Sequence, residues 1–350
     1  MSDADPRSDP SIWWFAFGYF ASYVPYSALT KYVTSTGGVS GNTLLPLSAV
    51  ASMVGMFAFI SAMRWWRYAG RHTVAGVSVP VPSRWTLLSG LCTAAIIPTT
   101  TLAYTFSGVS IVFMMLLMRG GVLVIAPVVD FVARRRVRWF SWIALALSIS
   151  ALLAAFSGTA SYNLTVVAVV DLVIYLAAYF VRLRFMSRLA KSGDNTARLR
   201  YFVEEQMVAT PALVATLVIW AFAFHGPMSD DLRLGFTTFW HSGHVATALI
   251  IGLFSQGTGV FGGLVLLDKR ENTYCVPVNR ASSILAGLFA SGVLAWVAGT
   301  GRVDANELVG AGLILAAIVV LSLPALWQKR VTRDCRSDRV PYPCPPSPRE

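Results

Sequence analysis

The chain has 350 residues, of which 55% are hydrophobic and only 13% are charged. A soluble domain usually carries about 25% charged residues, so this composition excludes an ordinary water-soluble globular domain. The net charge of +11 would suit a nucleic-acid-binding protein, but its distribution along the chain has a better explanation, given below. The four cysteines, two in apolar stretches and two near the C-terminus, do not form a disulfide framework.

Apolar stretches of about 20 residues recur along the sequence, a pattern typical of transmembrane helices. We therefore predict an all-α membrane protein. Residues 1–11 precede the first span and are acidic rather than basic, so we expect no cleavable signal peptide. Residues 328–350 are polar and rich in proline, which predicts a disordered tail. The ten predicted spans are 12–33, 43–63, 85–104, 109–131, 139–157, 165–183, 202–224, 244–267, 272–297 and 306–327.

The basic residues alternate between the connections of these spans. When the N-terminus is placed in the cytoplasm, 23 of the 28 Lys and Arg residues fall on the cytoplasmic side, and only Arg233 and Arg302 fall on the other. This asymmetry is the positive-inside rule, and it predicts a multi-pass membrane protein with both termini cytoplasmic. The basic excess thus reports topology and does not indicate a nucleic-acid partner.

Loop lengths divide the chain into two halves of five helices, 12–157 and 165–327. In each half a long connection follows the second helix (64–84 and 225–243), and a very short turn joins the third and fourth (105–108 and 268–271). Because five is odd, the second half would insert in the opposite orientation. Inverted repeats of this kind recur in secondary transporters, with the substrate site at the midplane between them.

Three basic residues lie within predicted spans and away from their cytoplasmic ends: Lys31, Arg119 and Arg280. Arg119 and Arg280 occupy matching helices of the two halves and lie about 12–15 Å deep at 1.5 Å per residue. A charge at that depth normally faces a cavity or a partner. Two converging arginines would form a fork for a phosphate or carboxylate. Lys31 lies near the outer end of its span, where it can also snorkel to the interface.

The alternative for each arginine is an ion pair that joins two helices, for which Asp171 is the obvious acid. Asp171, Tyr175 and Tyr179 form one helical stripe, and Tyr23 and Tyr26 belong to another in the first span. Both stripes are candidate cavity walls, although tyrosines often serve only packing. Glu205, near the start of the seventh span, is a candidate proton or gate carboxylate, or simply a solvated helix start.

Segments of the fourth and ninth spans resemble the drug/metabolite transporter superfamily, in its nucleotide-sugar, triose-phosphate and chloroquine-resistance-type branch. They are the run Phe113-Met114-Met115-Leu116-Leu117-Met118-Arg119-Gly120 and Val278-Asn279-Arg280. The resemblance implies ten helices in two inverted halves, with Asn279 and Arg280 at the position that contacts substrate phosphate. Glu204 and Glu205 stand where nucleotide-sugar carriers have asparagines, which argues against a nucleotide sugar.

Together these patterns predict an alternating-access carrier of a small organic anion, working by exchange or ion coupling. The alternative is a proton-coupled exporter of amino acids or cationic metabolites, with Asp171 or Glu205 as the charged ligand. No dense acidic, Ser/His or Cys/His constellation indicates an enzyme, and no cofactor or metal is expected. The expected partners are the solute and the lipid bilayer, with homodimer formation left open.

Overall fold

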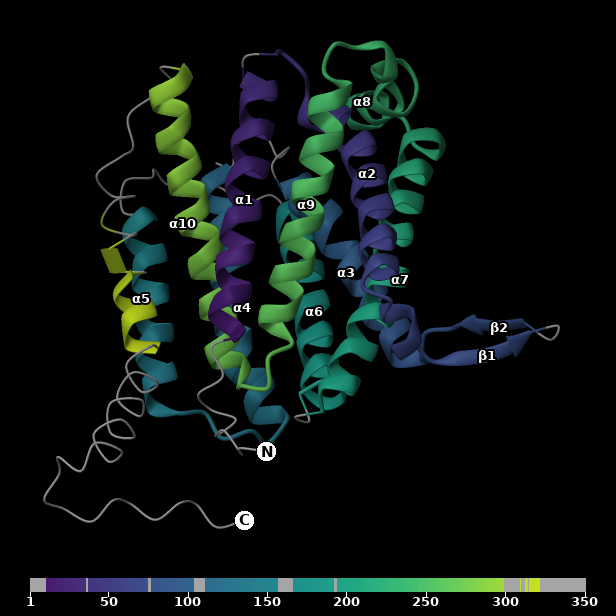
Figure 1. The fold of residues 1–350 in the computed structure, drawn as a ribbon. Helices are drawn as coiled ribbons and strands as arrows, with labels where there is room; N and C mark the ends of the chain where they lie inside the picture. The colour runs from purple at the N-terminus through teal and green to yellow at the C-terminus, as the bar shows by residue number, and fades with distance from the viewer. Residues whose placement is uncertain are drawn as a thin grey trace, which may run out of the picture.

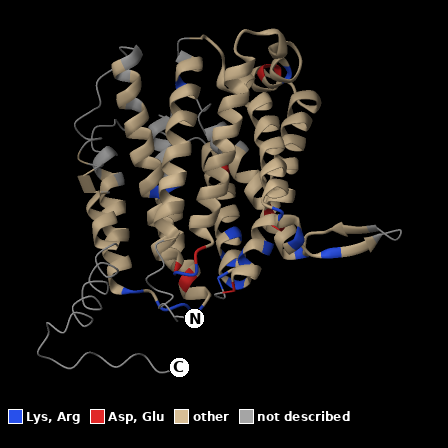
Figure 2. Ribbon diagram, in the orientation of Figure 1, with Lys and Arg blue, Asp and Glu red and all other residues tan. Residues whose placement is uncertain are grey.

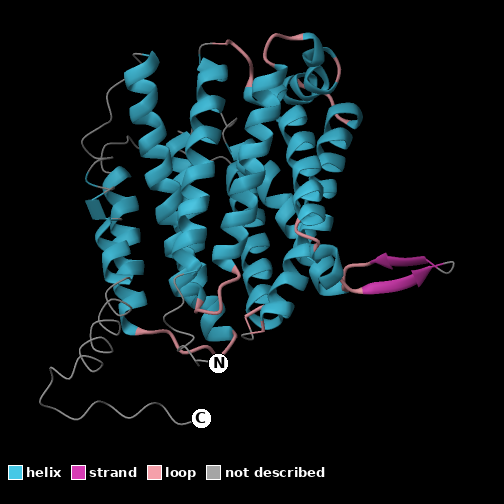
Figure 3. Cartoon of the chain, viewed as in Figure 1, coloured by secondary structure: helices cyan, strands magenta, loops and turns pink. Residues whose placement is uncertain are grey.

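The computed structural model describes residues 11–35, 37–74, 77–103, 111–156, 166–191 and 194–298, together with 309, 312–313 and 315–321. Long helices stand side by side in a bundle, and a small hairpin projects from its flank (Figures 1 and 3). In chain order the elements are α1 (Ser11–Ser35), α2 (Gly41–Ala62), η1 (Trp65–Tyr68), β1 (Arg71–Val74), β2 (Val77–Pro80), α3 (Arg84–Ala103), α4 (Ile111–Val132), α5 (Trp139–Phe156), α6 (Val166–Leu189), α7 (Asn195–Ala223), α8 (Pro227–Phe236), η2 (Thr238–His241), α9 (Val245–Leu266) and α10 (Asn272–Ala298).

The long helices lie where the sequence predicts spans. Nine predicted spans coincide with α1 to α7, α9 and α10, mostly within two residues at each end. Two helices differ by more: α6 continues six residues beyond the predicted 183. Helix α7 begins seven residues before the predicted 202, because the side chain of Asp194 accepts hydrogen bonds from two amides of its first turn. The predicted tenth span, 306–327, falls mostly outside the described residues, of which 315–321 are helical.

Length and apolar composition identify the chain as a membrane protein. Among the described residues, α2, α7 and α9 are long and apolar enough to cross a bilayer. Large apolar side chains also point outward from the bundle, among them Phe131, Trp296 and Trp14, which are 83%, 87% and 69% exposed. Such an exterior suits lipid rather than water, and the helices satisfy their own backbone hydrogen bonds, as a bilayer requires. The chain is thus an α-helical membrane protein.

Both long connections contain structure where the sequence analysis expected loops. Residues 225–243 form α8 and η2, with Pro227 at the first turn of α8. Residues 64–84 contain η1 and the antiparallel hairpin β1–β2, in which Arg71 pairs with Pro80 and His72 with Val79. The hairpin projects sideways from the bundle, roughly perpendicular to the helix axes (Figure 1).

Helix packing joins segments that are distant in the sequence. The most extensive contacts are those of α1 with α9 and α10, of α2 with α9, and of α3 with α6 and α7, while α4 packs against α6. Small residues allow the closest approaches. A Cβ atom on Gly252 of α9 would collide with the carbonyl oxygen of Ser48 on α2, and one on Gly90 of α3 would lie 2.9 Å from that of Glu205 on α7.

The two ends of the bundle differ in charge. Lys and Arg residues gather at the end where α1, α3, α7 and α10 begin, which we call the basic end (Figure 2). The hairpin and the turn between α9 and α10 also lie there (Figure 1). The opposite end carries α8 and few charges.

Candidate functional site

A cavity of about 360 Å³ lies within the bundle, between eight of its helices. This volume is within the range of small-molecule sites. Its walls combine aromatic, amide, hydroxyl and guanidinium groups with apolar side chains. The polar and aromatic side chains that line it are Tyr19, Tyr23 and Tyr26 of α1, Ser52 of α2, Thr93 of α3, Arg119 of α4, Tyr175, Tyr179 and Arg182 of α6, Gln206 and Thr210 of α7, Ser255, Gln256 and Thr258 of α9, and Asn279, Arg280 and Ser283 of α10.

Arg119 and Arg280 line this one cavity from two different helices. Arg119 is the ninth residue of α4 and Arg280 is the ninth residue of α10. Each guanidinium group contacts a tyrosine: Arg119 donates to the hydroxyl of Tyr23 at 3.1 Å, and the Cζ of Arg280 lies 5.0 Å from the ring centroid of Tyr179. Arg280 is 8% exposed, and its Nε has no hydrogen-bond partner among the described residues. The structure therefore brings the two predicted arginines to a common space.

The two tyrosine stripes both form part of the cavity lining. Tyr19, Tyr23 and Tyr26 on α1 are spaced by four and three residues, and Tyr175, Tyr179 and Arg182 on α6 have the same spacing. Ring centroids of Tyr19 and Tyr23 lie 5.7 Å apart, and those of Tyr175 and Tyr179 lie 4.9 Å apart. Packed rings hold one another in place, so the hydroxyl groups have defined positions.

Asn279, predicted from the family resemblance, also lines the cavity next to Arg280. Its Nδ2 donates to the carbonyl oxygen of Gly262 on α9 at 3.4 Å, which orients the amide. Gln206 and Gln256 add two amides that sequence reasoning did not select as binding residues. The sequence could have indicated both residues, because a glutamine inside an apolar span needs a polar neighbour or a ligand.

Glu205, predicted as a substrate or proton ligand, lies behind the cavity wall in an ion pair. Its carboxylate accepts from Nε and an Nη of Arg182 at 2.8 and 3.1 Å, and from the hydroxyl of Ser89 at 2.8 Å and of Thr93 at 3.1 Å. Glu205 is fully buried and Arg182 is 7% exposed. Two parallel N–H···O bonds are the strong form of an arginine–carboxylate pair. In this structure Glu205 therefore forms an ion pair with Arg182 and does not face the cavity as a ligand group.

Asp171 and Lys31 are not among the residues that line the cavity. Asp171 is buried in α6, and no described residue hydrogen-bonds its Oδ2. Asp171 forms no salt bridge with any described residue, so the alternative in which it pairs with Arg119 or Arg280 is not what the structure contains. Lys31 is exposed near the end of α1 opposite the basic end.

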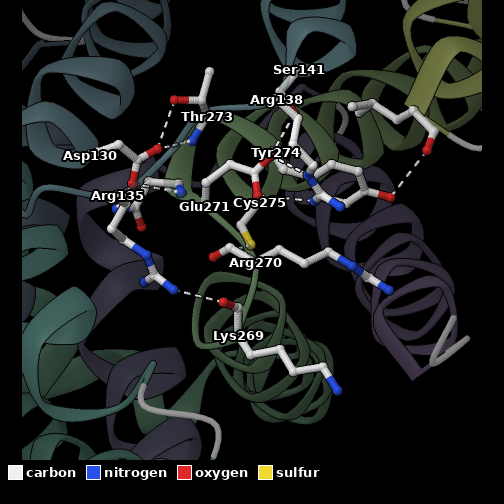
Figure 4. Close-up of polar contacts among 12 residues, drawn as sticks. Asp130, Arg135, Arg138, Ser141, Lys269, Arg270, Glu271, Thr273, Tyr274 and Cys275 are labelled. Atoms are coloured by element: carbon white, nitrogen blue, oxygen red, sulfur yellow. Dashed lines mark hydrogen bonds and ion pairs between the residues drawn. The ribbon is translucent and has the colours of Figure 1, made fainter. Parts of the chain in front are cut away.

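A second polar cluster, the basic-end network, joins the α4–α5 connection to the α9–α10 turn (Figure 4). Asp130 accepts from the backbone N–H and side chains of Asn272 and Thr273 at 2.7–2.9 Å, which caps the start of α10. Glu271 accepts two hydrogen bonds from Arg138 at 2.8 and 2.9 Å and one from Ser141 at 2.8 Å.

Two opposing effects set the pKa of Glu271. Burial would raise the pKa, but the hydrogen bonds and charge of Arg138, with help from Ser141, outweigh it and hold the pKa of Glu271 below its usual range. The carboxylate therefore stays ionised at neutral pH and keeps the α9–α10 turn attached to α5.

Comparison with known proteins gives the fold alone. No protein-family model and no curated protein matches this chain. One solved structure, described as "Crystal structure of protein", superposes on 91% of this chain and 99% of its own with a TM-score of 0.59 and 15% sequence identity. At that identity the likeness extends to the arrangement of helices and carries no activity.

Proposed function

We propose that this protein is a secondary transporter that carries a small organic anion through the central cavity by alternating access. The observation that carries the proposal is the charge of the cavity wall. The described lining residues include three arginines and no aspartate or glutamate, and one of these arginines, Arg182, is paired with Glu205 behind the wall. Charged groups within a membrane are expensive and mark ligand pathways.

Arg280 gives the most direct support for an anionic cargo. Its guanidinium is buried against an aromatic ring and still has an N–H group without an acceptor. An arginine fork that meets a carboxylate or phosphate gains two parallel charge-assisted hydrogen bonds. The competing cation exporter would need an acid in the wall, whereas Glu205 is bound to Arg182 and Asp171 is not among the lining residues. The cavity therefore favours a negatively charged cargo.

We further propose ten transmembrane helices in two inverted five-helix repeats. Helix contacts support this. If α1 corresponds to α6, α2 to α7, α3 to α9 and α4 to α10, then the main contacts occur in corresponding pairs. The packing of α1 on α9 then matches that of α6 on α3, α2 on α9 matches α7 on α3, and α1 on α10 matches α6 on α4. Arg119 and Arg280 also lie at the same position in the corresponding helices α4 and α10.

This plan, with the resemblance of the fourth and ninth spans, favours membership of the drug/metabolite transporter superfamily. The same proposal places both termini and the basic end in the cytoplasm, in keeping with the distribution of Lys and Arg. Single-cysteine variants Ser78→Cys in β2 and Thr237→Cys after α8, made after replacing the native cysteines, test it with a membrane-impermeant thiol reagent. Both positions are exposed. We expect labelling from opposite faces, and labelling of both from one face would overturn the orientation.

Flux measurements test the cargo. Purified protein in proteoliposomes should take up or exchange one or more small carboxylates or phosphate esters, and Arg119→Met and Arg280→Met should abolish that flux. The matched control is Arg84→Met, because Arg84 is exposed at the basic end and stacks on Trp85 outside the cavity. Uptake of cations with no anion flux would contradict the proposal, as would full anion flux in both cavity variants.

A further inference from the structure

One amide in the cavity wall has a hydrogen-bonding group without a protein partner. Gln256 of α9 is 7% exposed and lines the cavity. Its Nε2 donates to the sulfur of Met56 on α2 at 3.1 Å, while its Oε1 has no hydrogen-bond partner in the part of the chain that the structure describes. A buried acceptor that lacks a donor is unfavourable, and such groups in native proteins call for an explanation.

The orientation of this amide follows from its neighbour. A thioether sulfur has no hydrogen to donate, so it can accept from Nε2 but cannot satisfy Oε1. Turning the amide over would place the oxygen against the sulfur and leave both N–H groups without that acceptor. The amide therefore presents a carbonyl oxygen, an acceptor, that no described protein group satisfies.

The same cavity thus offers two complementary groups to a ligand. Arg280 has a buried N–H donor without an acceptor, and Gln256 has a buried acceptor without a donor. Both residues are more than nine-tenths buried and both line the cavity. A simple carboxylate, or a fully ionised phosphate ester without another polar group, would satisfy only the arginine.

We propose that the cargo is an anion that also carries an O–H or N–H donor, and that Gln256 accepts from this donor and so selects the cargo. The inference rests on the proposed anion transport and narrows its substrate class to hydroxy acids, amino acids and polyol or sugar phosphates. A site built to hydrogen-bond a hydroxyl or amino group discriminates strongly against the analogue that lacks it, because the site's own polar group is then left unpaired. Gln256 is in these terms a specificity-determining residue.

Matched pairs of probes test this on the purified full-length protein. The pairs are lactate with propionate, alanine with propionate, and glycerol 3-phosphate with propyl phosphate, each titrated by calorimetry or intrinsic tryptophan fluorescence. In every pair that binds, we expect the wild-type protein to prefer the member with the donor by about tenfold or more. Gln256→Met keeps an unbranched side chain without a strong acceptor, so it should reduce that preference to near onefold while binding of the poorer member is retained.

The control is Leu253→Met on the same helix, whose side chain is 55% exposed on the outside of the bundle and should leave the preference intact. Equal wild-type binding within the pairs overturns this inference and leaves anion transport standing, and this comparison needs no variant that must fold. A preference that survives Gln256→Met also overturns it. Absence of binding by every probe overturns both the inference and the proposed anion carrier.

Discussion

Arginine is used in opposite ways in the central cavity and in the basic-end network. In the network, Arg138 meets Glu271 in two hydrogen bonds, with 32% of the arginine side chain exposed. In the cavity, Arg280 is only 8% exposed, yet its neighbour is the ring of Tyr179 rather than a carboxylate. The more deeply buried arginine thus has the weaker set of protein partners, the reverse of what structural stability alone would favour.

Under the proposed function, this difference separates residues that stabilise the fold from residues that bind the ligand. Arg182 lies at the boundary, because it lines the cavity and is also paired with Glu205. Breaking a pair should therefore cost stability, while removing Arg280 should cost binding. Three predictions address this contrast, from the largest expected effect to the smallest.

The largest effect is expected for Glu205→Ala. This change strands the buried guanidinium of Arg182, so the free energy of unfolding should fall by about 3–5 kcal/mol. Reversible unfolding in mixed micelles, or the thermal midpoint followed by tryptophan fluorescence, measures it. The double variant Arg182→Met/Glu205→Leu, which removes both charges, should recover most of the loss. A change below about 1 kcal/mol in Glu205→Ala would contradict the assignment of this pair to structure.

A smaller effect is expected for Arg280→Lys, and it should concern binding rather than stability. Lysine keeps the charge but replaces a planar fork by a point charge, so the affinity for the anionic cargo should fall about tenfold. Arg280→Met should abolish anion-dependent thermal stabilisation while leaving the midpoint of the ligand-free protein unchanged or higher, since a buried charge is removed. A ligand-free protein that unfolds at a much lower temperature would instead assign Arg280 to the fold.

The smallest effect concerns the pH dependence contributed by Glu271. Because its pKa is held below the ordinary 4.5, its ionised form contributes stability that is present above that value and is lost as the pH falls through the lowered pKa. The thermal midpoint should decline across this acidic window, and Glu271→Gln should flatten that part of the profile. An identical profile in the variant would show that other carboxylates account for the decline.

Hydrophobic patterning predicted the helices well, because a bilayer demands about 20 apolar residues wherever a helix crosses it. The early start of α7 was missed since its first turn is polar, although Asp194 is a recognisable N-cap residue. The hairpin was missed because residues 64–84 were treated as a basic loop, even though Thr73, Val74 and Val77 suit strands.

The candidate site was predictable in part. Depth and matching helices brought Arg119 and Arg280 to attention, and both line the cavity. The pairing of Glu205 with Arg182 could not be predicted, because each lies on a different helix and the sequence does not show which faces meet. For the same reason Asp171 was considered as the acid for a cavity arginine, whereas the acid beside the cavity is Glu205.

The packing of the helices also says which parts of the protein can move together. The contacts gather α1, α2, α9 and α10 into one group and α3, α4, α6 and α7 into another, so each group draws two helices from each half of the chain. Arg280 belongs to the first group and contacts Tyr179 in the second, while Arg119 belongs to the second and contacts Tyr23 in the first. Each arginine therefore contacts a tyrosine of the other helix group. A ligand bound by both arginines would connect the two groups. In the proposed alternating access, one helix group would move relative to the other. The N-terminal half of the chain would not move as a unit against the C-terminal half.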